Sequence, residues 1–402
     1  MTETTKGTET SVAPGSWTEV LAVFLRLGLT SFGGPIAHFG YFRREYVERR
    51  RWLDEHAFAD LVALCQFLPG PASSQLGIAI GTHRAGMAGG LAAWLGFTLP
   101  SAIALAVFGL LTASIDVSQA GWVHGLKLAA VAVVAQAVLS MARALTPDWP
   151  RRLVALGAAG VALAWATPFS QVAIIAGGAM AGLVLPASRL GAPPGDVSSP
   201  LSRRVGVFAL VAFFALLAGL PVLRTLDGQP AALAEAFYRA GSIVFGGGHV
   251  VLPLLHASVV DPGWVSNDRF LAGYGAAQAV PGPLFTFAAY LGTVASPAPN
   301  GVAGAIVALA AIFLPSFLLI FGTLPFWDRL RQAAGVRRAL RGTNAAVVGL
   351  LLAALYNPIL TSAIVAPVDV AIAGVAFMIL LPGRVPPIVV VALCALVGQA
   401  MD

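Results

Sequence analysis

The chain has 402 residues, of which 58% are hydrophobic and only 10% charged, and its mean hydropathy is +0.83. Soluble domains carry about 25% charged residues, so this composition excludes a soluble protein and indicates a polytopic membrane protein. The formal net charge of +6 does not indicate nucleic-acid binding, because the arginines cluster in loops between apolar segments, where basic residues orient membrane proteins.

In chain order, the sequence begins with a polar tail, residues 1–16, which lacks the apolar core of a signal peptide. A first repeat, residues 17–187, contains apolar segments at approximately 17–40, 57–82, 86–112, 120–145, 151–168 and 171–187. A connecting region, residues 188–230, combines a Pro/Gly/Ser-rich linker with an extra transmembrane helix at 204–223. A second repeat, residues 231–402, contains apolar segments at 231–256, 269–296, 301–325, 342–357, 361–381 and 385–401. The predicted fold is therefore an all-α polytopic membrane protein.

The two halves carry the same series of short motifs in the same order. The aligned pairs are FLRLGLTSFGGP (24–35) with FYRAGSIVFGGG (237–248), QFLPGPASS (66–74) with QAVPGPLFT (278–286), and LPS (99–101) with LPS (314–316). A kink tolerated in a membrane helix would explain one such stretch. An ordered series in both halves predicts a duplicated transporter scaffold.

The distribution of arginine predicts how the halves are oriented. If every segment crossed the membrane, the arginine-rich loop 43–51 and the pair Arg151 and Arg152 would lie on opposite sides, against the positive-inside tendency. If the first two segments of each half are re-entrant, the arginine-rich loops of both halves face the cytoplasm, and loop 256–268, which has no Lys or Arg, is external. The sequence thus predicts two inverted-topology repeats with broken or re-entrant helices, a cytoplasmic N-terminus and an external C-terminus.

Proline and glycine interrupt one apolar segment in each half at the same place. Because proline ends a helix and suits the first position of the next one, the first helix should stop near Leu68 and its successor should begin near Pro71. The start of a helix carries free N–H groups and partial positive charge, which suit an anion. Broken membrane helices are tolerated only inside protein or beside a wet cavity, so both breaks are expected to face one midplane site. The predicted substrate-binding residues at the breaks are Pro69, Gly70, Pro71, Ser73, Pro281, Gly282 and Pro283, with a second pair of breaks at Gly33, Gly34, Gly246 and Gly247.

Four further polar side chains are predicted to bind the substrate. Gln66 and Gln278 precede the breaks, where an amide can donate to an oxyanion or cap a free carbonyl, and both interpretations remain open. Arg26 and Arg239 lie inside apolar segments, where a charge is costly and indicates function, and a guanidinium matches oxyanions in geometry. The alternative for both arginines is a side chain that extends to the membrane surface.

Asp60, Lys127 and Asp369 are the predicted candidates for coupling transport to ion movement, although Lys127 can equally be an interfacial lysine. His38 and His249 follow the glycine breaks, but the histidines lack metal-ligand spacing and no metal site is expected.

Enzymatic activity is not expected, because the chain has no GxxxxGK[ST], HExxH or GxSxG motif, and no cofactor is predicted. The two cysteines, Cys65 and Cys394, are expected to be packing residues, and a membrane-embedded reductase using Cys65 is a minor alternative.

The combination of Phe32-Gly33-Gly34-Pro35, Phe245-Gly246-Gly247-Gly248 and the two Gln-x-x-Pro-Gly-Pro motifs resembles the chromate ion transporter family in its long duplicated form. The resemblance covers nearly the whole chain and implies a bacterial inner-membrane secondary transporter that exports chromate, confers chromate resistance, and uses an ion gradient or exchange with a related oxyanion.

The residues themselves indicate only an anion site, which suits sulfate equally, so a transporter or channel for sulfate or another oxyanion is the alternative. The expected partners are chromate or sulfate and the lipid bilayer, without nucleic acid, and a homo-oligomer is left open. Because Gly248 stands where the first half has Pro35, a strictly symmetric site is not expected.

Overall fold

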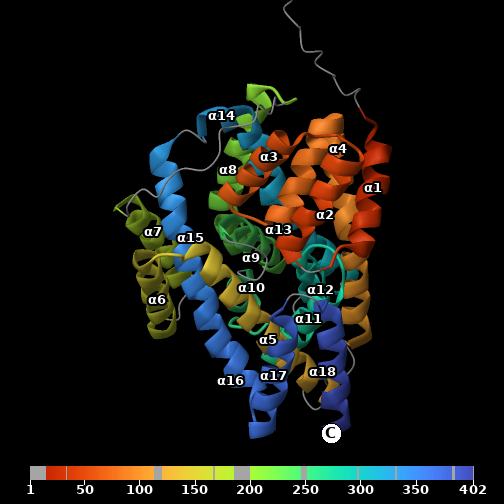
Figure 1. Cartoon of the computed structure of the whole chain (residues 1–402), viewed down its shortest axis with the longest axis vertical. Coiled ribbons are helices and arrows are strands. Elements are labelled where there is room, and N and C mark those ends of the chain that lie inside the picture. Colours follow the sequence, from red (N-terminus) through yellow and green to blue (C-terminus); the bar gives the residue numbers. More distant parts are fainter. Residues whose placement is uncertain are drawn as a thin grey trace, which may run out of the picture.

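The computed structural model describes residues 15–32, 34–112, 120–165, 168–184, 200–245, 251–296, 298–330, 333–382 and 385–401. The regular elements in these ranges are all helical, as the sequence predicts (Figure 1). The described chain contains five stretches long and apolar enough to cross a membrane, at 72–112, 121–145, 203–225, 301–326 and 334–363. The protein is therefore an all-α polytopic membrane protein.

The helices of the first half are α1 (Trp17–Thr30), α2 (Gly34–Arg43), η1 (Arg44–Arg49), α3 (Glu55–Phe67), α4 (Ala72–Thr112), α5 (Gly121–Leu145), α6 (Trp149–Ala164) and α7 (Pro168–Val184). The connecting helix α8 (Arg203–Asp227) covers the predicted extra segment. The second half contains α9 (Gln229–Ile243), α10 (Val251–Val259), α11 (Asn267–Ala279), η3 (Leu284–Thr286), α12 (Phe287–Val294), α13 (Gly301–Thr323), η4 (Leu324–Phe326), α14 (Trp327–Leu330), α15 (Ala334–Ala354), η5 (Leu355–Leu360), α16 (Thr361–Ala363), α17 (Pro367–Leu380) and α18 (Pro387–Met401).

Two segment boundaries differ from the hydropathy-based prediction. Helix α15 begins at Ala334 and not near residue 342, and the predicted segment 361–381 becomes α16 and α17, separated by a short non-helical stretch. Arginine has good helix propensity but low hydropathy, so Arg337, Arg338 and Arg341 extend α15 beyond its apolar part.

The first predicted broken segment, 17–40, folds into a helical hairpin. The chain turns between α1 and α2, so that Phe24 of α1 packs edge-to-face on Phe42 of α2, with ring centroids 5.5 Å apart. Glu19, near the start of α1, pairs with Arg50, which follows η1. The start of α1 and the end of η1 therefore lie together.

The second broken segment also returns to its starting side. Arg84 ends the first arm of α4, pairs with Glu19, and lies over the ring of Trp52, just before α3, at 5.1 Å. At Ala85 and Gly86 the backbone leaves helical geometry, with a φ of +63° at Gly86, and α4 folds back on itself. Arms 72–84 and 86–112 then pack so closely that Gly81 and Gly89 meet backbone to backbone. The sequence places a segment boundary at this same point.

The corresponding part of the second half forms a hairpin from α11 and α12. The Tyr290 hydroxyl on α12 donates to the backbone oxygen of Arg269 on α11 at 3.0 Å. At the open end, the Ser296 N–H donates to the oxygen of Trp264 at 2.8 Å. Helices α11 and α12, before and after the break, thus pack against each other as a hairpin, as α3 and the first arm of α4 do.

The later helices of the two halves are exchanged. Helix α5 of the first half packs against α17 and α18 of the second, and α15 of the second half packs against α6 and α7 of the first. Small residues allow the backbones to approach: Gly125 lies against the backbone of Cys394, and Gly342 lies against Gly178 and Gly182. A Cβ at Gly125 or Gly342 would collide with the partner backbone.

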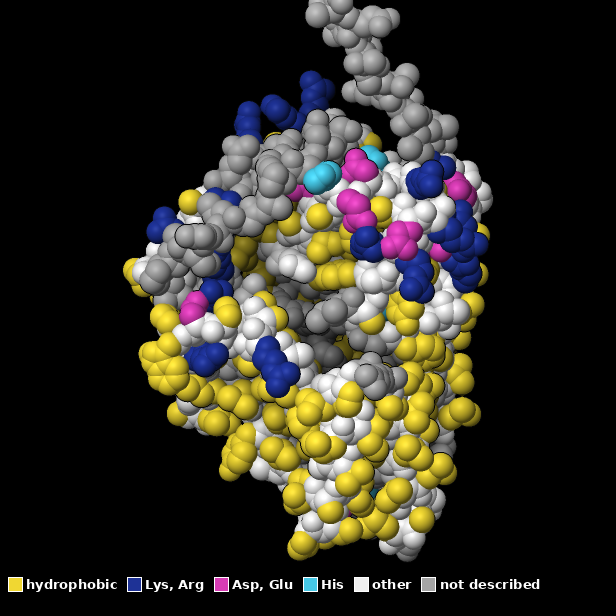
Figure 2. Space-filling view, in the orientation of Figure 1, with side chains coloured by type: hydrophobic (Ala, Val, Ile, Leu, Met, Phe, Trp, Pro, Cys, Tyr) yellow, Lys and Arg dark blue, Asp and Glu magenta, His cyan; other side chains and the backbone are white. Residues whose placement is uncertain are grey.

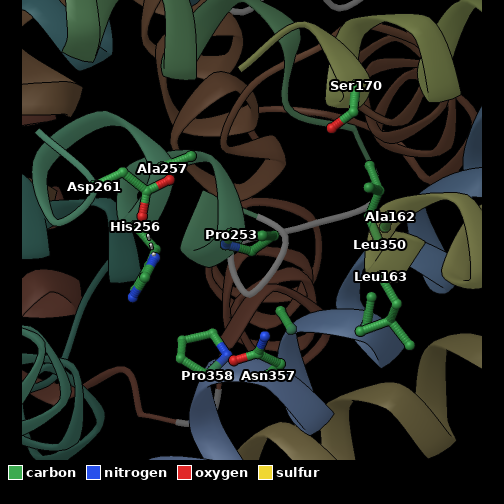
Figure 3. A pocket seen from close by; sticks show the side chains of 12 residues that line it. Ala162, Leu163, Ser170, Pro253, His256, Ala257, Asp261, Leu350, Asn357 and Pro358 are labelled. Carbon is green, nitrogen blue, oxygen red and sulfur yellow. Dashed lines mark ion pairs between the residues drawn. The ribbon is translucent and has the colours of Figure 1, made fainter. Parts of the chain in front are cut away.

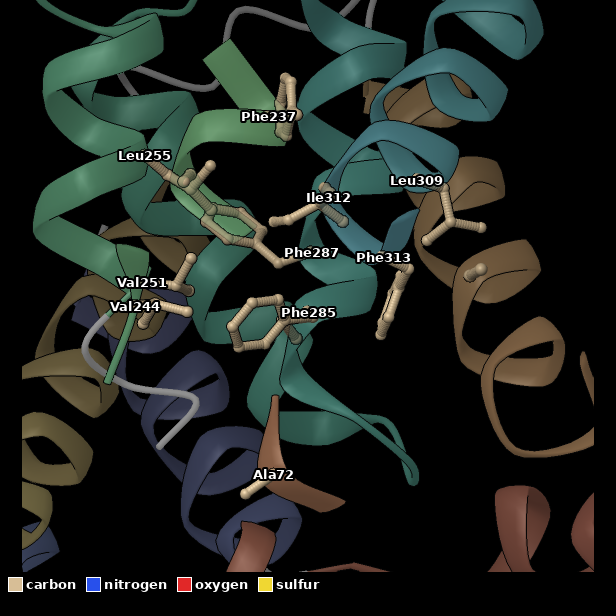
Figure 4. Close-up of a cluster of buried hydrophobic side chains, with 14 of the residues drawn as sticks. Ala72, Phe237, Val244, Val251, Leu255, Phe285, Phe287, Leu309, Ile312 and Phe313 are labelled. Atoms are coloured by element: carbon tan, nitrogen blue, oxygen red, sulfur yellow. The ribbon is translucent and has the colours of Figure 1, made fainter. Parts of the chain in front are cut away.

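The main hydrophobic core runs through both halves. Figure 4 shows the part where Phe285 and Phe287 meet side chains of α9, α10 and α13, with Ala72 of the first half nearby. In Figure 1, α1 lies at the upper end of the molecule and the C-terminus at the lower end. On the face shown in Figure 2, most Lys and Arg side chains gather in the upper half, while the lower part is largely hydrophobic.

Candidate functional site

The helix breaks adopt the geometry that their sequences predict. Helix α3 ends at Phe67 with Leu68 as its extended C-cap, and α4 begins at Ala72, directly after Pro71. Gly70 has a φ of +126° and Gly282 a φ of +87°, a backbone region that glycine adopts readily. Both Pro-Gly-Pro stretches are therefore sharp turns between two helices.

The two Pro-Gly-Pro breaks lie against the opposite halves of the chain. The Gly70 N–H donates to the oxygen of Val244, at the end of α9, at 2.7 Å. The Gly282 N–H donates to the oxygen of Ser31, at the end of α1, at 2.8 Å. Gly70 aligns with Gly282 in the internal repeat, and Ser31 aligns with Val244. The two hydrogen bonds are thus reciprocal, and each joins the break of one half to a helix end of the other half.

The two serines of the repeated Leu-Pro-Ser motif each lie at one of the breaks. The Ser101 hydroxyl donates to the oxygen of Pro281 in the second break. Its counterpart Ser316 lies beside the first break, where a Cβ on Gly70 would stand 3.1 Å from the Ser316 hydroxyl oxygen. The oxygen of Pro69 instead accepts from the Gln75 side-chain amide at 2.6 Å. The motif was recognised in the sequence as part of the repeat, but not as part of the site.

Several buried polar atoms at the breaks have no hydrogen-bond partner among the described residues. Those on the elements that flank the breaks are the hydroxyls of Ser31, Ser74 and Ser316, the amide oxygen of Gln75 and the amide nitrogen of Gln278. The first N–H groups of α4 face the same break and have no acceptor within their helix. Because leaving a buried polar group unpaired costs about 1–3 kcal/mol, these atoms are candidate contacts for a polar ligand.

The remaining predicted break residues are placed as follows. Ser73 is buried in the first turn of α4, and Gly34, with a φ of +78°, begins α2. Gln278 is partly buried, whereas the Gln66 side chain is exposed on α3. Gly33, Gly246, Gly247 and His249 lie outside the described residues.

Arg26 and Arg239 each pair with a buried carboxylate. Arg26 contacts Glu45 at 2.5 Å, and Arg239 contacts Glu235 at 2.8 Å. The Arg26 side chain is 48% exposed and that of Arg239 31%. Sequence reasoning missed both acids, although Glu235 precedes Arg239 by four residues, a spacing that favours a helical ion pair.

Glu45 is the centre of a larger ionic cluster outside the membrane-spanning helices. It also accepts from Arg50 at 2.7 Å and from Arg49 at 3.2 Å. Burial opposes ionisation of Glu45, but the hydrogen bond from Arg50 and the charge of Arg26 outweigh it and lower the pKa of Glu45 below its ordinary value. Glu45 is thus held as a carboxylate, and it fixes Arg26.

Two of the predicted coupling residues join the halves through side-chain contacts that involve α5. Lys127 is buried and its ammonium contacts Asp268, in the first turn of α11, at 2.6 Å. One turn away, His124 contacts Asp369 at 2.8 Å. Asp369 also accepts from the backbone N–H groups of Val365 and Ala366, so it caps α17. The third candidate, Asp60, is buried on α3.

A separate pocket of about 180 Å³ lies between the halves, bordered by α6, α7, α10, α15 and η5 (Figure 3). Its polar lining comes from Ser170, His256, Asp261 and Asn357. His256 lies 3.4 Å from Asp261 and 3.1 Å from the side chain of Asn267. The pocket is not lined by the Pro-Gly-Pro residues.

The described residues contain no cluster of three or more His, Cys, Asp or Glu that could hold a metal ion. Cys65 and Cys394 are both buried free cysteines, as their positions in apolar segments predict.

Comparison with known proteins places these features in a family. The family model described as "Chromate transporter" matches residues 18–183 and again 231–399. A chromate transport protein of Pseudomonas aeruginosa is 29% identical over 97% of this chain and 94% of its own length. A probable chromate transport protein of Synechococcus elongatus is 30% identical, with 83% and 82% covered, and a chromate transport protein of Cupriavidus metallidurans is 26% identical, with 84% and 81% covered.

No solved structure matches the chain. The family model covers most of the chain, and the relatives are named as transport proteins and not as enzymes. The chain is therefore a multi-pass membrane protein that belongs to the chromate transporter family.

Proposed function

We propose that this protein is a secondary transporter that exports chromate across the bacterial inner membrane and thereby confers chromate resistance. Family membership supports chromate as the substrate. The observation that carries the mechanism is the reciprocal pair of hydrogen bonds, Gly70 to Val244 and Gly282 to Ser31. Each bond joins a helix break to the opposite half, and unpaired hydroxyls lie on the flanking elements, which supports a site for a tetrahedral oxyanion between the halves.

The proposal includes two inverted repeats, residues 17–187 and 231–402, joined by the connecting region 188–230. The separate family matches to the two halves support this division, and so does the exchange of α5 and α15 between them. An inverted pair presents the same break to each side of the membrane in turn. Chromate then reaches a central site from the cytoplasm and leaves it outside, driven by an ion gradient or by exchange with another anion.

Arg26 and Arg239 supply positive potential along the route in this proposal. Each is partly exposed and is held by a buried carboxylate, so its guanidinium keeps donors free for a passing anion. Lys127, Asp60 and Asp369 stay candidates for coupling. The Lys127–Asp268 ion pair and the His124–Asp369 contact join helices of different halves, so a change in protonation there would act on how the halves pack.

Flux into proteoliposomes tests the proposed function directly. Vesicles containing the protein should take up labelled chromate faster than empty vesicles, and a pH gradient should alter the rate if protons are coupled. Uptake of sulfate with no uptake of chromate would replace chromate by the alternative substrate.

The role of the arginines is tested separately in cells. We expect Arg26→Ala and Arg239→Ala to lower chromate resistance at unchanged protein level, because each removes a fixed positive charge from the route. Arg151→Ala is the matched control, since Arg151 pairs with Asp148 in the first turn of α6 and lies away from the breaks. Full resistance in both Arg26→Ala and Arg239→Ala cells would remove these residues from the mechanism.

A further inference from the structure

The two Pro-Gly-Pro breaks differ in one polar residue. In the second break, the Ser101 hydroxyl satisfies the oxygen of Pro281. In the first break, the Gln75 amide satisfies the equivalent oxygen of Pro69, at 2.6 Å. The position that aligns with Gln75 in the second half is Phe287. Gln75 therefore makes the hydrogen bond in the first break that Ser101 makes in the second. The Ser316 hydroxyl, which corresponds to that of Ser101, has no partner among the described residues.

The orientation of the Gln75 amide follows from this contact. A carbonyl oxygen can only accept, so Gln75 must turn its NH₂ group toward Pro69, and its own oxygen faces the other way. That oxygen is buried, with Gln75 0% exposed, and none of the described residues donates to it. The first break thus contains an acceptor that lacks a donor.

Donors without acceptors surround the same break. The hydroxyls of Ser316 and Ser74 are unpartnered in residues that are 0% and 2% exposed. Ser316 lies beside Gly70, and Ser74 belongs to the first turn of α4, whose free N–H groups add partial positive charge. An anion that accepts several hydrogen bonds and donates one would satisfy all of these groups.

Chromate and sulfate differ in whether they can donate a hydrogen bond near neutral pH. Chromate takes up a proton close to neutral pH and then carries an O–H group, whereas sulfate is protonated only in strong acid. The two dianions have the same tetrahedral geometry, so shape alone discriminates weakly between them. A site that demands one O–H donor rejects an analogue lacking it, because the buried acceptor is then left unpaired.

We propose that the first break binds the hydrogen chromate monoanion, with its O–H donating to the Gln75 amide oxygen and its other oxygens accepting from Ser316, Ser74 and the start of α4. This inference rests on the proposed function and adds the form of the substrate and the basis for excluding sulfate. Gln75, Ser316 and Ser74 are then specificity-determining residues.

Equilibrium exchange of labelled chromate in proteoliposomes, with equal pH on both sides, tests the inference without a proton gradient. As the pH falls from about 8 to about 6, the KM for total chromate should fall, by about 10-fold for each pH unit above the pH at which chromate takes up its proton. The KM expressed as the concentration of hydrogen chromate should stay constant. Sulfate should compete weakly at every pH.

Substitutions at the first break assign the effect to its residues. Gln75→Phe introduces the residue of the second break, and Gln75→Met removes the acceptor at similar volume. Both should flatten the pH dependence of KM and increase competition by sulfate. Ser316→Ala should raise KM at every pH, because it removes a donor. Ser258→Ala is the matched control and should keep the pH dependence, because the Ser258 hydroxyl donates to the oxygen of Leu254 within its own helix α10.

Equilibrium dialysis of chromate against the purified variants provides a reading that does not require transport. A wild-type KM that follows the chromate dianion, or an unchanged pH dependence in folded Gln75→Phe and Gln75→Met, would overturn the inference while chromate transport stands. No chromate flux or binding at any pH would overturn the proposed function together with it.

Discussion

Glu45 is the buried carboxylate that holds the cytoplasm-facing arginines in the proposed topology. Its pKa is lowered in the folded protein, so it stabilises the fold at pH values above the ordinary glutamate pKa, and that contribution is lost as the pH falls through the lower folded pKa. We expect Glu45→Gln to reduce stability by about 2 kcal/mol at neutral pH, a value discounted for the exposure of Arg26 and Arg49.

Thermal unfolding in detergent measures this effect. The difference between wild type and Glu45→Gln should be large at neutral pH and shrink in acid. Glu48→Gln is the control, because Glu48 pairs with Arg43 in the same segment but is half-exposed, and its loss should cost less than about 1 kcal/mol. Equal destabilisation by both variants would contradict a special role for Glu45.

At the residue scale, the sequence identified polar groups more successfully than it identified their partners. Arg26 and Arg239 stand out in the sequence as charges inside apolar segments, but the partner of Arg26 comes from another helix. Lys127 likewise finds Asp268 at a distance of 141 residues. Such pairs depend on tertiary packing, for which neither periodicity nor spacing carries a signal.

At the scale of elements, the Pro-Gly-Pro turns are held by conformation and by close packing. A Cβ at position 282 would stand 2.6 Å from the Ser101 hydroxyl and 3.0 Å from the backbone oxygen of Phe97, and the φ of +87° disfavours any other residue. We expect Gly282→Ala to lower transport strongly and to cost about 1–3 kcal/mol of stability.

Flux and thermal unfolding of the same preparation test that expectation. Gly157→Ala is the matched control, because Gly157 lies inside α6 and a Cβ added there would point into open space. It should leave flux intact and raise helix stability slightly. Normal flux in Gly282→Ala would show that the second turn tolerates a side chain and that its geometry is not needed.

The breaks were predictable because proline and glycine act locally, and α3 ends beside Leu68 as their chemistry requires. The turn within α4 at Ala85 and Gly86 coincides with the boundary between the predicted segments 57–82 and 86–112. The exchange of α5 and α15 was not, because the glycines at positions 125 and 342 indicate close helix packing without naming the partner helix.

At the scale of the whole molecule, the ends of the first-half hairpins lie on one side, tied by Glu19, Arg50 and Arg84. The inverted-repeat proposal places loop 256–268 on the other side. In a background with Cys65→Ser and Cys394→Ser, we expect Glu48→Cys to react with a membrane-impermeant thiol reagent only from the cytoplasm, and Pro262→Cys only from outside. Both positions are exposed. Labelling of both from the same side would refute the inverted arrangement.

Because α5 and α15 each pack against helices of the opposite half, the order of synthesis affects when these contacts can form. Gly125 of α5 packs against Cys394 of α18, which lies 269 residues further along the chain. At a synthesis rate of about 5–20 residues per second, α5 waits roughly 15–50 s in the membrane before α18 exists. During that interval no α18 exists to cover the glycine face of α5. A nascent chain interrupted after the first half therefore exposes this face, and we expect membrane quality control to recognise it.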